Sequence, residues 1–151
     1  MNTEKALVWF RRDLRDTDHA PLAAALSQAR QVYCVFVFDR SILDALPSRA
    51  DRRVDFIHGS LVALDAALRA RGGGLIVRHG HPQDEIPALA QHLGVDHVFA
   101  GRDYEPAAKT RDAEVGERLA ARSIRLHLVK DQAVFDGDSV LTQAGKPFTV
   151  F

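Results

Sequence analysis

The feature that most constrains the fold is an unbroken apolar run at residues 6–10 that ends in a dense charged cluster at residues 11–15. Such a run is typical of a strand that helices cover on both faces, as in parallel sheets. In open α/β sheets, ligands bind beyond the carboxyl ends of the strands. The charged cluster therefore stands where such a fold would bind a ligand. From this pattern alone, a solvated loop held by salt bridges is an equal alternative.

Further apolar runs alternate with helical patterns along the chain. The expected strands are 6–10, 32–38, 75–77, 95–100 and 124–129, and the expected helices are 21–29, 52–71, 82–93 and a segment from Pro106. Residues 16–18 are expected to cap the first helix, and the glycines at 72–74 to end the second. The alternation favours parallel strands with right-handed crossovers. We therefore predict an α/β, Rossmann-like three-layer sandwich, with helices on both faces of a five-stranded parallel sheet of order 3-2-1-4-5.

Composition narrows the classes of protein. Twenty basic residues balance twenty acidic ones, so no global field would hold the chain on nucleic acid or on an anionic membrane. The single cysteine, Cys34, excludes an internal disulfide and suits a reducing compartment, so we expect a cytoplasmic protein. There is no apolar stretch of roughly 20 residues and no signal-peptide pattern.

The familiar catalytic and cofactor motifs are absent from the sequence. Neither the G-x-G-x-x-G loop of dinucleotide enzymes nor the G-x-x-x-x-G-K-[ST] loop of NTPases occurs. His79 and His81 have no cysteine or carboxylate at ligand spacing, so we expect no metal site. His58, His92 and His97 have no serine or cysteine partner, which argues against a hydrolase triad.

A polar constellation remains at the expected strand ends and at the start of the second helix. Its members are Arg11, Arg12, Asp39, Arg53, Asp103 and Glu105. Arginine can donate to carboxylates, phosphates or polar ring edges, and carboxylates accept from ring N–H or hydroxyl groups. With the aromatic residues Phe10, Phe36 and Phe38 nearby, the pattern predicts a pocket for a planar polar ligand. A surface ion-pair network is the competing interpretation.

The octet at residues 8–15, Val-Trp-Phe-Arg-Arg-Asp-Leu-Arg, resembles the N-terminal signature of the DNA photolyases and cryptochromes. Further matches run along the whole chain: Arg53 with Phe56 and Leu61, Gly80-His81-Pro82, Tyr104-Glu105-Pro106 with Arg111 and Asp112, and residues 145–151.

The resemblance implies the N-terminal antenna-binding domain of a class I-like cyclobutane pyrimidine dimer photolyase over residues 1–130. Residues 131–151 would begin the linker to a helical domain that holds FAD, and the apolar end at 148–151 leads us to expect a chain cut from something longer. The parent would repair UV-damaged DNA, a carbon–carbon lyase reaction. We expect this fragment to carry no catalytic residue and no repair activity by itself.

The resemblance also implies which antenna the domain binds. Family members that hold a deazaflavin carry residues like Arg12, Asp39, Arg53 and Asp103 at the matching positions. Folate-binding members have asparagine and glutamate where this chain has alanines, at 107 and 108. The expected antenna is therefore 8-hydroxy-5-deazaflavin, ahead of FMN and methenyltetrahydrofolate. The expected contact residues are Phe10, Arg12, Phe38, Asp39, Arg53, Asp103 and Glu105.

Two other functions stay open at this point. The octet is shared with cryptochromes, so the parent could be a blue-light receptor whose N-terminal domain serves mainly as an interaction surface. More remotely, the chain could be a nucleotide-binding α/β domain that only shares the fold.

Overall fold

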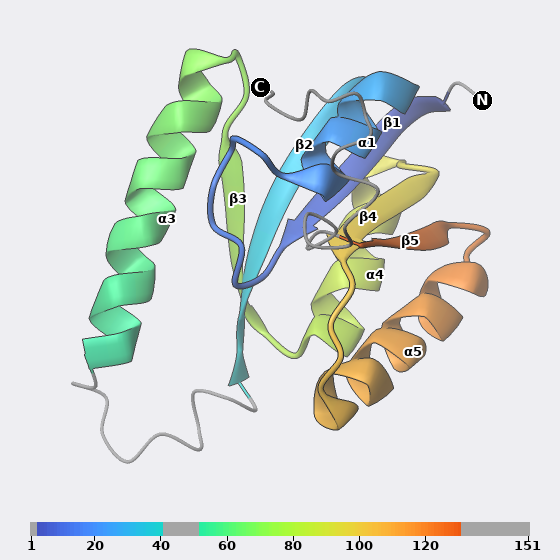
Figure 1. The fold of residues 1–151 in the computed structure, drawn as a ribbon. Coiled ribbons are helices and arrows are strands. Elements are labelled where there is room, and N and C mark those ends of the chain that lie inside the picture. The colour runs from blue at the N-terminus through green and yellow to red at the C-terminus, as the bar shows by residue number, and fades with distance from the viewer. Residues whose placement is uncertain (1–2, 41–51, 131–151) are drawn as a thin grey trace, which may run out of the picture.

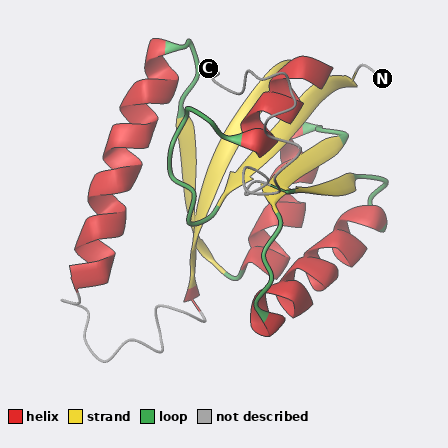
Figure 2. Ribbon diagram, viewed as in Figure 1, coloured by secondary structure: helices red, strands yellow, loops and turns green. Residues whose placement is uncertain are grey.

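A parallel sheet of five strands, in the order β3-β2-β1-β4-β5, forms the middle of the computed structural model, which describes residues 3–40 and 52–130 (Figure 1). The elements are β1 (Thr3–Phe10), α1 (Ala20–Gln28), β2 (Ala29–Asp39), α3 (Arg52–Ala70), β3 (Leu75–Gly80), α4 (Pro82–Leu93), β4 (His97–Gly101), α5 (Pro106–Ala120) and β5 (Arg125–Val129). Strands and helices alternate along the chain (Figure 2). The predicted fold class and strand order are confirmed.

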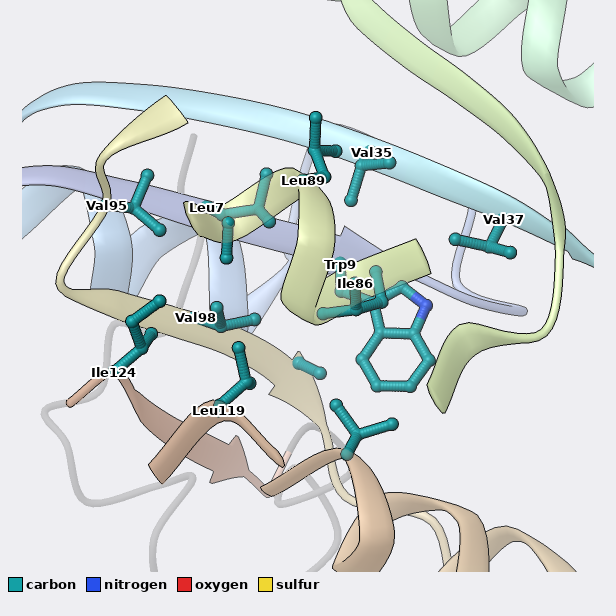
Figure 3. Close-up of a cluster of buried hydrophobic side chains, with 13 residues drawn as sticks. Leu7, Trp9, Val35, Val37, Ile86, Leu89, Val95, Val98, Leu119 and Ile124 are labelled. Atoms are coloured by element: carbon teal, nitrogen blue, oxygen red, sulfur yellow. The ribbon is translucent and has the colours of Figure 1, made fainter. Parts of the chain in front are cut away.

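Successive side chains of the central strand β1 enter two separate cores, because side chains alternate across a sheet. Leu7 and Trp9 pack toward α4 and α5, whereas Val8 and Phe10 pack on the opposite face, where α1 and α3 lie. Figure 3 shows the first core, with side chains of β1, β2 and β4 meeting those of α4 and α5. Both faces of the sheet are thus buried, which explains the unbroken apolar run of β1.

The start of α1 differs from the prediction. The helix is capped by His19, whose Nδ1 accepts a hydrogen bond of 3.1 Å from the backbone N–H of Leu22. Residues 16–18 were the wrong choice of cap, because Asp18 takes a left-handed backbone conformation and Asp16 pairs with Arg71 instead. The cap itself is local, with acceptor and donor three residues apart, but histidine is not among the residue types that usually cap helices.

Strand boundaries also differ from the apolar runs. β2 begins at Ala29 because the residues before its apolar run also pair with β1, with Thr3 opposite Ala29 and Lys5 opposite Gln31. β3 continues beyond the predicted end to Gly80, which lies opposite Asp39 of β2. Backbone pairing with a neighbouring strand extends both elements past the reach of the hydrophobic pattern.

Some expectations fall outside what the structure describes. Residues 131–151, which we assigned to an interdomain linker, are not described, and neither is the side chain of Arg53 in the first turn of α3. Within residues 3–40 and 52–130, none of the helices combines the length and apolar character needed to cross a bilayer.

Two glycines, one at a helix end and one inside a helix, allow a matched test of backbone conformation. Gly94 ends α4 with φ of 73°, in the left-handed region that costs an L-residue about 1 kcal/mol or more. Gly94→Ala should therefore lower the free energy of unfolding by about 1 kcal/mol. Gly59→Ala, in the exposed interior of α3 with open space around the added Cβ, should instead raise it by about 0.5–1 kcal/mol. Urea denaturation of both variants checks the opposite signs.

Candidate functional site

A groove of ≈ 580 Å³ opens at the carboxyl ends of β1 and β4. Its lining residues are Arg11, Arg12, Asp13, Gly101, Arg102, Asp103, Tyr104, Glu105 and Pro106. One wall is the loop after β1 and the other is the loop that leads from β4 into α5. The chain leaves β1 toward β2 on one side and adds β4 on the other, so this is the switch point at which open α/β sheets bind ligands.

Arg12 reaches from the first wall to two carboxylates of the second. Its Nη2 lies 3.3 Å from Asp103 Oδ2 and 3.6 Å from Glu105 Oε1. The Arg12 side chain is 73% exposed, so these ion pairs contribute little to stability. The same guanidinium and carboxylates are accessible to a ligand in the groove.

Asp103 is held in its charged form by the loop around it. Burial alone would raise its pKa, but the backbone N–H of Glu105 and the guanidinium of Arg12 outweigh this effect, so the pKa of Asp103 lies below its usual value. At neutral pH, Asp103 is therefore an ionised acceptor that can take a hydrogen bond from a ring N–H or a hydroxyl group.

Arg11 has a different environment from its neighbour Arg12. Its Nη1 lies 2.6 Å from Oδ1 of the buried Asp112 on α5, and its Nη2 donates to the carbonyl of Gly101 at the end of β4. Its guanidinium also stacks over the Trp9 ring at 4.6 Å from the ring centroid. Arg11 thus holds the base of the groove together, as expected for a structural arginine.

Asp13 and His19 fix the shape of the arginine loop. The backbone N–H of Arg11 donates to Asp13 Oδ1 at 2.9 Å, and His19 Nε2 lies 2.8 Å from Asp13 Oδ2. His19 is fully buried and stacks on Phe10 with ring centroids 4.5 Å apart. Burial alone would raise the pKa of Asp13. The contacts with His19 and with the Arg11 N–H lower it by more, so the pKa of Asp13 lies below its usual value.

The predicted contact residues are only partly brought together. Arg12, Asp103 and Glu105 line the groove, whereas Phe10 is fully buried in the core. Phe38 stacks on the ring of His79 at 4.8 Å. Asp39 ends β2, on the side of β1 away from β4. Neither Phe38 nor Asp39 is among the described residues that line the groove.

Sequence reasoning missed the roles of Asp112 and the His97–His127 pair. Asp112 falls on the buried face of α5 in step with Ala108, Val115 and Leu119, and a carboxylate on an apolar face was the available signal. His97 lies within the strand predicted over 95–100 and begins β4, but its contact was not predicted: its Nδ1 lies 2.8 Å from His127 Nε2 on β5. That contact required the strand register, which the sequence does not show.

The family model described as DNA photolyase matches residues 6–151. The chain belongs to the DNA photolyase family. It is 36% identical over 145 residues to a deoxyribodipyrimidine photo-lyase from Synechococcus sp., covering 96% of this chain and 30% of that protein. Its fold corresponds to the N-terminal α/β domain of the photolyases.

Two further comparisons extend the relationship. A cryptochrome DASH from Natronomonas pharaonis is 34% identical over 143 residues, covering 92% of this chain and 30% of that protein. The archaeal photolyase from Sulfolobus tokodaii matches with a TM-score of 0.76 at 29% identity, covering 83% of this chain and 29% of that one. Its crystal structure contains two FAD molecules and is described as implying a novel light-harvesting cofactor. The chain thus spans less than a third of the length of these photolyase and cryptochrome relatives.

The lowered pKa of Asp13 predicts how its contribution depends on pH. Asp13→Asn should lower the free energy of unfolding by about 1–2 kcal/mol at neutral pH, because a charged hydrogen-bonding partner of His19 is lost. The carboxylate stabilises the fold above its unfolded pKa of about 3.9, and this contribution is lost as pH falls through the lower folded pKa. Urea denaturation from neutral to acidic pH should show the two proteins converging in that acidic window. A difference that stays constant with pH would contradict the assignment.

Proposed function

We propose that this domain binds a light-harvesting chromophore in the groove and serves a DNA photolyase that repairs UV-induced pyrimidine dimers. The observation that carries the proposal is the meeting of Arg12 with Asp103 and Glu105 across a groove at the sheet's switch point, in a chain of the DNA photolyase family. This donor and acceptor set suits the polar edge of a planar ring. Arg12 would donate to ring carbonyl oxygens, and Asp103 would accept from a ring N–H or hydroxyl group.

Among chromophores, 8-hydroxy-5-deazaflavin is our first choice. Arg12 and Asp103 at the groove, with Asp39 and Arg53, match the pattern of deazaflavin-binding members. FMN follows, and the two FAD molecules in the Sulfolobus tokodaii photolyase support a flavin-type antenna in a relative. Ala107 and Ala108 offer no polar side chain to a folate, which places methenyltetrahydrofolate last.

The residues of this domain would position the chromophore through hydrogen bonds and would form no covalent bond with it. When bound, the chromophore supplies absorption of near-ultraviolet or blue light and transfers the excitation by dipole coupling to FAD. Dipole coupling depends on the angle between the two rings, so the protein's contribution is a fixed orientation. Arg12 and the ionised Asp103 would set that orientation, one from each wall of the groove.

The remaining features of the proposal concern the parent protein. Residues 131–151 would begin the linker to a helical domain that holds FAD and contacts damaged DNA. The cytoplasm is the proposed location. No catalytic residue is proposed within this chain.

The 34% identity to a cryptochrome DASH favours a second candidate, a blue-light receptor. Repair of dimer-containing DNA by the full-length protein under blue light distinguishes the two functions. A receptor without repair activity would leave the dimers intact.

Chromophore binding can be measured on the purified chain. Titration with 8-hydroxy-5-deazaflavin should shift the ligand's absorption spectrum and raise the melting temperature of the protein. Asp103→Ala should weaken binding by about 10- to 100-fold, the effect of losing one charge-assisted hydrogen bond of about 1.5–3 kcal/mol.

Glu117→Ala provides the control, because Glu117 is an exposed acid on α5 that does not line the groove. Its affinity should equal that of the wild type. FMN and methenyltetrahydrofolate, titrated in parallel, rank the alternative antennas. Equal affinity of wild type and Asp103→Ala would place the binding site elsewhere, and no spectral shift with any of the three ligands would reject the antenna function.

A further inference from the structure

A buried charged cluster lies behind the groove, at the junction of β1, β4 and α5. Its members are Arg11, Asp112 and Arg111, together with the single tryptophan, Trp9. Asp112 Oδ1 receives Arg11 Nη1 at 2.6 Å and Arg111 Nε at 3.1 Å. The side chains of Asp112 and Trp9 are only 3% and 2% exposed, so the cluster is part of the protein interior.

Both arginines also cover the same aromatic ring. The guanidinium carbon of Arg11 lies 4.6 Å from the Trp9 centroid, and that of Arg111 lies 5.5 Å from it. Figure 3 shows the Trp9 ring at one end of the core shared with α4 and α5, beside Ile86. Arg111 on the helix therefore packs against the central strand through a cation–π contact, in addition to its contact with Asp112.

The cluster joins the two walls of the groove. Arg11 belongs to the first wall and bonds to Gly101, where the second wall begins, as well as to Asp112 two turns into α5. The exposed pairs of Arg12 span the mouth of the groove, but exposed ion pairs restrain little. The buried cluster is therefore the rigid connection between the β1 loop and the start of α5.

Stability does not explain why charges occupy this position. A buried ion pair is often no more stabilising than apolar residues of the same volume, since each charge loses its hydration. Here Asp112 Oδ2 and Arg111 Nη2 are buried without a hydrogen-bond partner in the described part of the chain, so the cluster is not optimised for stability. Its directional contacts instead specify one relative placement of three elements.

We propose that Arg111 and Asp112 are positioning residues that set the separation and angle of the two groove walls, acting through Arg11 and Trp9. Neither residue lines the groove among the described residues, so they act on a ligand through the walls. For a chromophore, this inference rests on the proposed antenna function. The cluster would then fix the orientation of the bound ring as well as its affinity.

The separation of the walls can be measured without any ligand. Spin labels on Thr17→Cys, an exposed position in the loop after β1, and on Ala107→Cys, an exposed position at the start of α5, report the distance distribution by electron paramagnetic resonance. Cys34 does not interfere, because burial raises its pKa to about 12 and leaves the thiol unreactive. Arg111→Met, which keeps the length of the side chain and loses its charge, should broaden the distribution. Arg111→Lys should give an intermediate width.

The control is Arg118→Met on the same helix. Arg118 pairs with Asp84 of α4 at 2.6 Å and with Glu114 at 2.8 Å, remote from the groove lining. The Arg118→Met substitution removes a comparable set of charged contacts from α5 and should leave the distribution of spin-label distances as narrow as in the wild type. Broadening in Arg118→Met equal to that in Arg111→Met would reduce Arg111 to a general stabiliser and overturn the proposal.

Ligand measurements on unlabelled protein then test whether the placement of the groove walls affects chromophore binding. Arg111→Met should raise the dissociation constant for 8-hydroxy-5-deazaflavin by about tenfold, the lower end of what supporting residues contribute in metal sites. The fluorescence anisotropy of the bound chromophore should also fall, since a loosened wall lets the ring rotate. Asp112→Asn should change both quantities in the same direction.

The possible results separate this inference from the antenna function. An unchanged wall distance in both Arg111→Met and Arg111→Lys rejects the positioning role, whatever the ligand does. A broadened distance in a protein whose wild type binds none of the three chromophores supports the positioning role and rejects the antenna function. Broadening together with weaker, more mobile binding supports both.

Discussion

The buried contact between Arg11 and Asp112 is the interaction on which the carboxyl edge of the sheet depends. It brings a charged side chain from the central strand onto a carboxylate of α5 and the last carbonyl of β4. A parallel sheet aligns its strands through the backbone ladder, but it does not determine how the loops beyond the ladder approach each other. Here the side chains at the strand ends determine how these loops approach each other, and the groove is the space left between the loops.

The two arginines that follow β1, Arg11 and Arg12, differ in burial and therefore in the partners available to their charges. Arg11 is desolvated, paired and stacked on Trp9, so its charge is used within the protein. Arg12 is exposed, and its carboxylate partners sit on a different loop, so its charge can be shared with a ligand at little cost to stability. Neighbouring residues of one type thus lie in different environments, so one is used within the protein and the other would be available to the proposed ligand.

The limits of sequence reasoning follow from the same geometry. The apolar runs and helical periods are local signals and predicted the strands and helices, and their alternation along the chain predicted the parallel sheet and its order. Arg12, Asp103 and Glu105 were predicted to meet because the carboxyl ends of neighbouring parallel strands share an edge. The cap of α1 by His19 was not predicted, because histidine is not among the residue types that usually cap helices. The burial of Asp112 was not predicted, since its partner Arg11 lies 101 residues away in the sequence. The side-chain contact of His97 with His127 depends on the register of β4 and β5, which sets His97 opposite Arg125 and Phe99 opposite His127. That register leaves no mark in a single sequence.

The separation of the two groove walls along the chain has a consequence for folding. Arg12 and Asp103 are 91 residues apart in sequence, and β1 must pair with β4 before they can meet. Such non-local pairings form slowly, because closing a long loop costs chain entropy before the contacts form. Local helices can exist while the β1–β4 pairing is still missing. We therefore expect the groove to be among the last features to form during folding, so that its ability to hold a ligand would report the completion of the β1–β4 pairing.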